Sequence, residues 1–147
     1  MNPQLSYREA AVRGSSTVGL VVLLYEQLIE DLRRARAAFA RGDVEARTRE
    51  INHAILVISH LQASLDKHQG GQVAMNLERF YDQVRRSLVE AQCQQSATIL
   101  EQQISHLILV HEAWVEVERN TAQPVAASGP AGAPTGGEER SRGGWNA

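Results

Sequence analysis

The residues best able to do chemistry in this sequence are five histidines, the carboxylates near them and one cysteine. Glu50 and His53 form a single Glu-x-x-His pair, the spacing with which di-iron carboxylate proteins hold metal inside a helical bundle. Such a site needs a second pair and further inward-facing glutamates. At about 100° per residue, Glu50 and His53 also point away from the apolar stripe of Ile51, Ile55 and Ile58. The sequence therefore predicts a solvated polar face here and no metal site.

The remaining candidate residues do not combine into a catalytic arrangement. His111 is the one histidine centred on an apolar stripe, where a hydrogen-bonded histidine at the edge of a core is commoner than a metal ligand. Cys93 has no second cysteine with which to form a disulfide or a zinc site. Gly70 and Gly71 indicate a turn, because the other residues of a phosphate-binding loop are missing. We therefore expect no enzymatic activity and no cofactor.

Charge and hydropathy argue against two further classes of partner. The 15 basic and 17 acidic residues give a formal net charge of −2, and no segment carries a run of like charge, so a nucleic-acid partner is not expected. The longest apolar run, residues 20–25, is far shorter than the roughly twenty residues of a membrane span. The first residues lack the basic and apolar regions of a signal peptide. We expect a cytoplasmic protein that does not insert into a membrane.

The pattern of apolar residues predicts helices and no strands. At 147 residues the chain has the size of one domain, and its apolar residues recur every three or four positions. The predicted helices cover residues 17–40, 43–66, 71–93 and 97–119. Ser15 or Ser16, then Asp43 and Ser96, are suited to cap helices, and Gly42 to end the first one. Short connections favour antiparallel neighbours, so the predicted fold is an all-α, up-down-up-down four-helix bundle over residues 16–119.

Two segments flank the predicted bundle. Residues 1–15 contain a short amphipathic pattern of Leu5, Tyr7 and Val12. Residues 120–147 are rich in proline, glycine and alanine, and such a composition cannot offset the entropy lost when a chain becomes ordered. We therefore expect a disordered tail, in which Trp145 is the one aromatic residue and a candidate docking residue.

The first and fourth helices carry more apolar surface than a bundle core needs. The surplus residues of the first helix are Leu20, Leu23 and Leu24. The second row of the fourth helix is Ile99, Val110 and Val117. Because the first and fourth helices are neighbours in such a bundle, we expect these two sets to line a groove for an incoming apolar helix. Coverage of the groove by residues 1–15 is the alternative, and the two are compatible.

The second and third helices also have a predicted core stripe and apolar residues outside it. The predicted core stripe of the third helix is Val73, Leu77, Phe80, Val84 and Leu88. In the second helix, Val44 belongs to the predicted stripe, whereas Leu56 and Val57 lie outside it and are expected to be exposed. Single exposed apolar residues of this kind are ordinary in soluble proteins.

A set of short motifs runs along the chain, and their order and spacing are more specific than any one of them. Across the second turn and third helix these are Ser64, Leu65, Asp66, Gly70, Gly71, Val73, Ala74, Asn76, Leu77 and Tyr81. Elsewhere they are Tyr7, the run Leu23, Leu24, Tyr25 and Glu26, the turn Gly42 and Asp43, and the pair Ala113 and Trp114. Over about residues 5–118 this pattern resembles the FliS family of flagellar export chaperones.

The resemblance implies a function. It implies a monomeric bundle that binds the disordered C-terminal segment of flagellin in the cytoplasm, prevents premature polymerisation and delivers flagellin to the export gate protein FlhA. The residues that we expect to contact or gate this partner are Tyr7, Leu20, Leu23, Leu24, Tyr25, Ile99, Val110 and Val117. Among them, Tyr25 also lies on the predicted core stripe, so a purely structural role is its alternative.

Other functions are compatible with the same surplus of apolar surface. The main alternative is another helical interaction protein, either a different secretion chaperone or a homodimer that pairs its own exposed leucines. A helix-bundle enzyme is a more distant alternative, because the residues needed for catalysis do not come together in the sequence.

Overall fold

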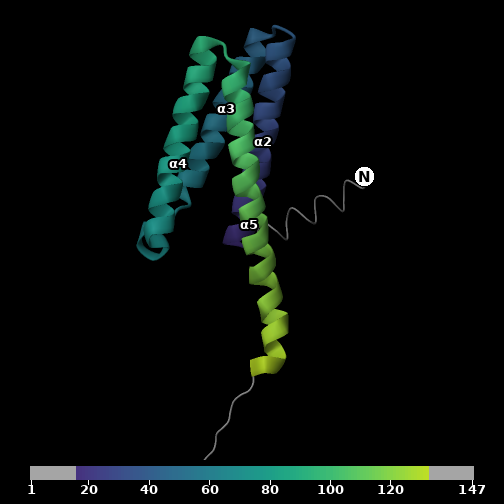
Figure 1. Ribbon diagram of the computed structural model, residues 1–147, viewed down its shortest axis with the longest axis vertical. Coiled ribbons are helices and arrows are strands. Elements are labelled where there is room, and N and C mark those ends of the chain that lie inside the picture. Colours follow the sequence, from purple (N-terminus) through teal and green to yellow (C-terminus); the bar gives the residue numbers. More distant parts are fainter. Residues whose placement is uncertain (1–15, 133–147) are drawn as a thin grey trace, which may run out of the picture.

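The computed structural model describes residues 16–132, with side chains described up to Thr121. The four helices of this part are α2 (Thr17–Ala40), α3 (Val44–Ala63), α4 (Lys67–Gln94) and α5 (Ala97–Gly132). They run alternately in opposite directions (Figure 1). Both α2 and α4 contact α3 and α5, so each helix packs between two neighbours and stands diagonally across from the third. The predicted all-α, up-down-up-down four-helix bundle is confirmed.

A Ser or Asp side chain caps the beginning of each helix, where the first backbone N–H groups have no partner within the helix. Ser16 Oγ accepts from the Gly19 N–H at 2.9 Å, and Asp43 Oδ1 accepts from the Ala46 N–H at 3.0 Å. Ser96 Oγ accepts from the Ile99 N–H at 3.2 Å. The three caps predicted from the sequence are therefore confirmed.

The third helix, α4, begins earlier than predicted. We expected a turn at Gly70 and Gly71, but Asp66 caps a first helical turn by accepting from the N–H groups of His68 and Gln69. The chain then bends at Gly71, whose φ of 53° and ψ of −130° are accessible to glycine and costly for other residues. Gly70 has a different constraint, since an added Cβ would lie 2.7 Å from the Cβ of Ala74.

The fourth helix, α5, is longer than predicted. It continues to Gly132, past the expected end at Arg119, so the prediction of a disordered tail was wrong for residues 120–132. Extending a helix costs much less than starting one, and alanine is frequent in residues 122–127, but Pro124 and Pro130 oppose the extension, so helix propensity alone does not explain it. Figure 1 shows this part of α5 projecting past the other three helices. Residues 133–147, including Trp145, lie outside the described residues, as does the segment 1–15.

The core follows most of the predicted stripes. The largest fully buried side chains are Tyr25, Tyr81, Leu28, Leu32, Ile51, Ile58, Leu61, Leu88, Leu100, Leu107, Val22 and Val84. Three expectations were wrong. Val57 is buried because it lies on the face of α3 that α2 covers, while Val44 and Val73 are exposed because each lies in or near the first turn of its helix, at an end of the bundle.

Tyr25 and Tyr81 join two helices that are not neighbours. The Tyr25 hydroxyl of α2 donates to the Tyr81 hydroxyl of α4 at 2.9 Å, and the ring centroids are 6.2 Å apart at an interplanar angle of 56°. Burial raises the pKa of both phenols above the ordinary value, so both remain neutral donors and acceptors. The Tyr25 hydroxyl also interacts with the side chain of Trp114. A buried hydroxyl that loses its partner is costly, so the two tyrosines stabilise each other.

This dependence predicts strong coupling between the two hydroxyl groups. Tyr25→Phe or Tyr81→Phe alone should lower the free energy of unfolding by about 1–3 kcal/mol, because each removes a hydrogen-bond partner from a buried hydroxyl. The double variant should cost clearly less than the sum of the two. Urea unfolding of the four proteins measures this coupling, and strictly additive losses would show that the hydroxyls act independently.

The bend in α4 gives a second prediction. Gly71→Ala should lower the free energy of unfolding by about 1–3 kcal/mol, because alanine is strained at this φ and ψ. Gln72→Ala, at the next position and also exposed, is the matched control and should change stability by less than about 0.5 kcal/mol. Equal urea midpoints for the two variants would mean that an alanine side chain at position 71 does not strain the backbone.

Candidate functional site

The Glu50 and His53 pair is used for packing between helices. Arg34 Nε of α2 donates to Glu50 Oε1 at 3.2 Å, and His53 Nδ1 lies 2.5 Å from Asp31 Oδ2. The carboxylate of Asp31 is fully buried and also accepts from Gln27 and Arg34. These contacts join α2 to α3 on one flank of the bundle. Within residues 16–132, no three His, Cys, Asp or Glu side chains form a group that could hold a metal ion.

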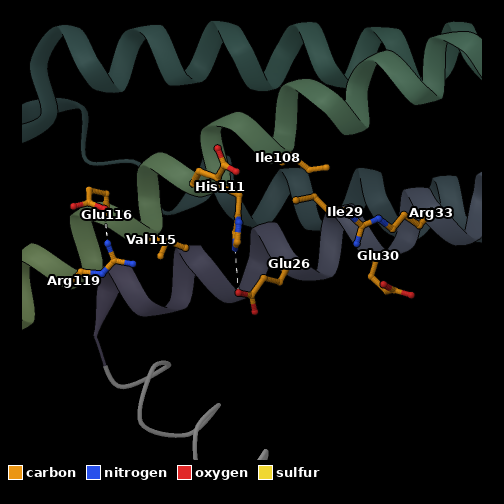
Figure 2. Close-up of a pocket in the computed structure, with 10 residues that line it drawn as sticks. Glu26, Ile29, Glu30, Arg33, Ile108, His111, Val115, Glu116 and Arg119 are labelled. Atoms are coloured by element: carbon orange, nitrogen blue, oxygen red, sulfur yellow. Dashed lines mark hydrogen bonds and ion pairs between the residues drawn. The ribbon is translucent and has the colours of Figure 1, made fainter.

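His111 lies at the edge of the core, where it was predicted to be hydrogen bonded. Its Nε2 atom is 3.1 Å from Glu26 Oε2 of α2, across a groove of about 620 Å³ between α2 and α5 (Figure 2). We call this the α2–α5 groove. Its residues are Glu26, Ile29, Glu30, Arg33, Ile108, His111, Glu112, Val115, Glu116 and Arg119. Most of these side chains are charged, so this is not the apolar groove that we predicted between the same two helices.

Two of the predicted leucines, Leu20 and Leu24, lie on the side of α2 away from the α2–α5 groove, whereas Leu23 lies close to the groove residue Glu30 around the helix. Leu20 and Leu24 precede Asp31 by eleven and seven residues, about three and two helical turns, so all three share one face. Because Asp31 contacts His53, that face lies toward α3. Leu20 is 44 % exposed, Leu23 is half-buried, and Leu24 is half-buried and packs against the core.

The predicted row of α5 also lies away from the α2–α5 groove. Val110 and Val117 each follow a groove residue, Ile108 or Val115, by two positions, which places them about 160° away around the helix. That side faces α4. Ile99 and Val110 are half-buried against the core, whereas Val117 is 43 % exposed. The two predicted rows therefore flank opposite sides of the α2–α5 pair, and the structure does not join them in one groove.

The last two predicted contact residues are Tyr25 and Tyr7, and the structure describes only Tyr25. Tyr25 is fully buried and bonded to Tyr81, so it is not accessible to a partner in this structure. Tyr7 lies outside the described residues. The sequence-based set therefore leaves Leu20 and Val117 as its well-exposed members.

The apolar cavity of the structure is at one end of the bundle, and sequence reasoning missed it. This end cavity measures about 220 Å³ and is mostly apolar. It is lined by Thr17, Val18, Val21, Ser64, Leu65, Asp66, Gly70, Val73, Ala74, Leu77, Tyr81 and Trp114. Eight of these positions belong to the motif at residues 64–81 that carries the family resemblance, and that coincidence was the available signal.

The exposed apolar residues adjoin this cavity. On α5, Val110, Trp114 and Val117 follow one another at spacings of four and three, so they form one stripe along the helix. Trp114 lines the cavity and Val117 lies one turn beyond it. On α4, Val73 lines the cavity and is 65 % exposed. The end cavity and this stripe together form an apolar surface that an amphipathic helix can cover.

None of the helices in the described part has the length and hydropathy needed to cross a membrane. The side chains around the end cavity are apolar groups, hydroxyls and the carboxylate of Asp66, which caps α4, rather than an acid, base and nucleophile in contact. This arrangement is suited to binding an apolar surface.

Comparisons with known proteins agree with this description. The family model described as flagellar protein FliS matches residues 1–121. The flagellar secretion chaperone FliS of Salmonella typhimurium is 34 % identical over 110 residues, which cover 74 % of this chain and 82 % of that protein. FliSB of Pseudomonas aeruginosa is 32 % identical over 106 residues, covering 72 % and 84 %. This chain therefore belongs to the FliS family of flagellar secretion chaperones.

Proposed function

We propose that this chain is a cytoplasmic export chaperone that binds the disordered C-terminal segment of flagellin. By holding that segment, it prevents flagellin from polymerising prematurely, and it delivers flagellin to the export gate protein FlhA. The observation that carries the proposal is the end cavity, most of whose lining belongs to the motif at residues 64–81 on which the family resemblance is based. Membership of a family of secretion chaperones supports the flagellar client.

The size of the end cavity indicates how the client binds. A volume of about 220 Å³ accommodates one large aliphatic or aromatic side chain. We propose that a client helix inserts one such residue between Leu77, Tyr81 and Trp114. The following turns of the client helix then lie along Val110 and Val117 of α5.

The energetics require several contacts rather than one. Ordering a disordered client costs on the order of 2–5 kcal/mol of the gross interaction energy. Fully burying one valine or leucine side chain contributes about 1.5–3 kcal/mol. One residue in the end cavity therefore only offsets the ordering cost, and useful affinity needs further apolar contacts along the helices. Because this binding consumes no nucleotide, release follows from competition at the export gate.

The exposed valines should matter for binding and little for folding. Val73→Ser combined with Val117→Ser should weaken binding of a flagellin C-terminal peptide tenfold or more, since both side chains become buried in the complex. The melting temperature should change little, because both are exposed when the protein is alone. Isothermal titration calorimetry with the peptide from the same cell measures the affinity.

The chain offers a matched control for this experiment. Leu109 is also 65 % exposed, but it lies on the face of α5 away from the core. Leu109→Ser should leave both the melting temperature and the affinity unchanged. Equal weakening by the Leu109 variant and by the valine double variant would contradict the proposed binding surface.

Leu20 and Leu24 separate a binding role from a structural one. Leu20→Ser should leave the melting temperature nearly unchanged and weaken peptide binding severalfold, if the client extends over the first turns of α2. Leu24→Ser should lower the melting temperature, because Leu24 packs against the core. Thermal melts and calorimetry on both single variants test this, and unchanged affinity in Leu20→Ser would exclude this flank from the binding surface.

A further inference from the structure

The α2–α5 groove has no part in the proposed function, and its chemistry differs from that of the end cavity. Its floor is apolar and consists of Ile29, Ile108 and Val115. Its rim carries Glu26, Glu30, Arg33, Glu112, Glu116 and Arg119. Four carboxylates face two guanidinium groups, so the rim is acidic overall. An occupant of this groove should bring a large apolar group together with positive charge.

We propose that the occupant is the chain's own C-terminal segment, residues 139–147, running back along α5. Trp145 rests on the apolar floor, Arg142 pairs with Glu112 and Arg140 pairs with Glu116. This inference goes beyond the proposed function, because the family match ends at residue 121 and the segment lies after it.

The length of the chain after Gly132 matches this register. Arg142 is ten residues beyond Gly132, a reach of about 33 Å when extended, and Glu112 lies twenty helical residues before Gly132, about 30 Å back. Trp145 reaches about 43 Å, and Ile108 lies about 36 Å back along the helix. An extended segment that turns at Gly132 therefore brings the tryptophan over the floor of the groove.

The charges match in the same register. Glu139 reaches about 23 Å from Gly132, and Arg119 lies about 20 Å back along α5. Arg140 then follows at the level of Glu116, which already pairs with Arg119 at 2.7 Å. No ion pair among the described side chains involves Glu112, so its carboxylate is available to Arg142. Exposed ion pairs of this kind add little affinity and mainly fix position, so the buried area of Trp145 supplies most of the binding.

The end cavity is a poorer match for this segment. Its one carboxylate, Asp66, accepts hydrogen bonds from the backbone N–H groups of His68 and Gln69 and so caps α4. The arginines of the C-terminal segment would find no acidic rim there.

The test uses the full chain and two-dimensional NMR of its methyl groups. Trp145→Ala should shift the methyl resonances of Ile29 and Ile108, because it removes the ring current of the indole from that part of the groove. The methyl groups of Ile51 and Leu61, in the core of α3, should not move. Asn146→Ala is the matched control in the same segment and should leave all of these resonances in place.

A charge swap tests the register. Arg142→Glu should move the groove resonances at least halfway toward their positions in Trp145→Ala, and adding Glu112→Arg should restore them. The charge swap contradicts the proposed register if it fails to restore the groove resonances.

The proposal is also overturned if the groove resonances do not change in Trp145→Ala. It is equally overturned if the shifts appear at Val73 and Leu77, which would place the indole in the end cavity. Shifts that vanish on dilution would indicate a second copy of the chain and would also overturn it. Flagellin binding is measured separately, so failure here leaves the proposed function intact.

Discussion

The hydrogen bond between the hydroxyls of Tyr25 and Tyr81 is the contact on which the rest of this bundle depends. It joins α2 and α4, which stand diagonally across the bundle, and both rings are buried. A polar pair inside an apolar core restricts the alternative packings, because a packing that separates the two tyrosines removes a hydrogen bond from a buried hydroxyl. The pair therefore holds α4 at a set distance and orientation relative to α2. Tyr81 lines the end cavity, so the same contact also shapes the candidate binding site.

The chaperone function that we propose depends on one end of the bundle, where helices of unequal length leave apolar side chains uncovered. Four helices cover one another only where all four are present, and the bend at Gly71 and the projecting end of α5 leave the apolar groups near Trp114 incompletely covered. A partner that brings its own amphipathic helix can complete the layer. This explains how a small protein can bind without a catalytic group, since the binding free energy comes from burying apolar surface against the cost of ordering the client.

The molecule keeps two kinds of surface apart. Around the end cavity the side chains are apolar, and a disordered apolar client fits there. Between α2 and α5 the floor is apolar but the rim is charged, as Figure 2 shows for Glu26 and Arg119. The charges discriminate between occupants, because a purely apolar helix would remove water from the carboxylates without giving them a new hydrogen-bond or charge partner, which is costly. A segment that carries arginines beside a tryptophan does not face this cost.

The sequence alone determined the features that depend on neighbours along the chain. Helix type, three of the caps and most core stripes follow from spacing and from side chains that bond to the nearest backbone groups, so they could be predicted. The sides on which Leu20, Leu24, Val110 and Val117 lie were decided by the tertiary structure. A stripe fixes which residues share a face, but which neighbouring helix covers that face depends on how the four helices rotate to pack their largest side chains. For the same reason Tyr81 and Trp114, distant in the sequence, meet at the end cavity only once the bundle has formed.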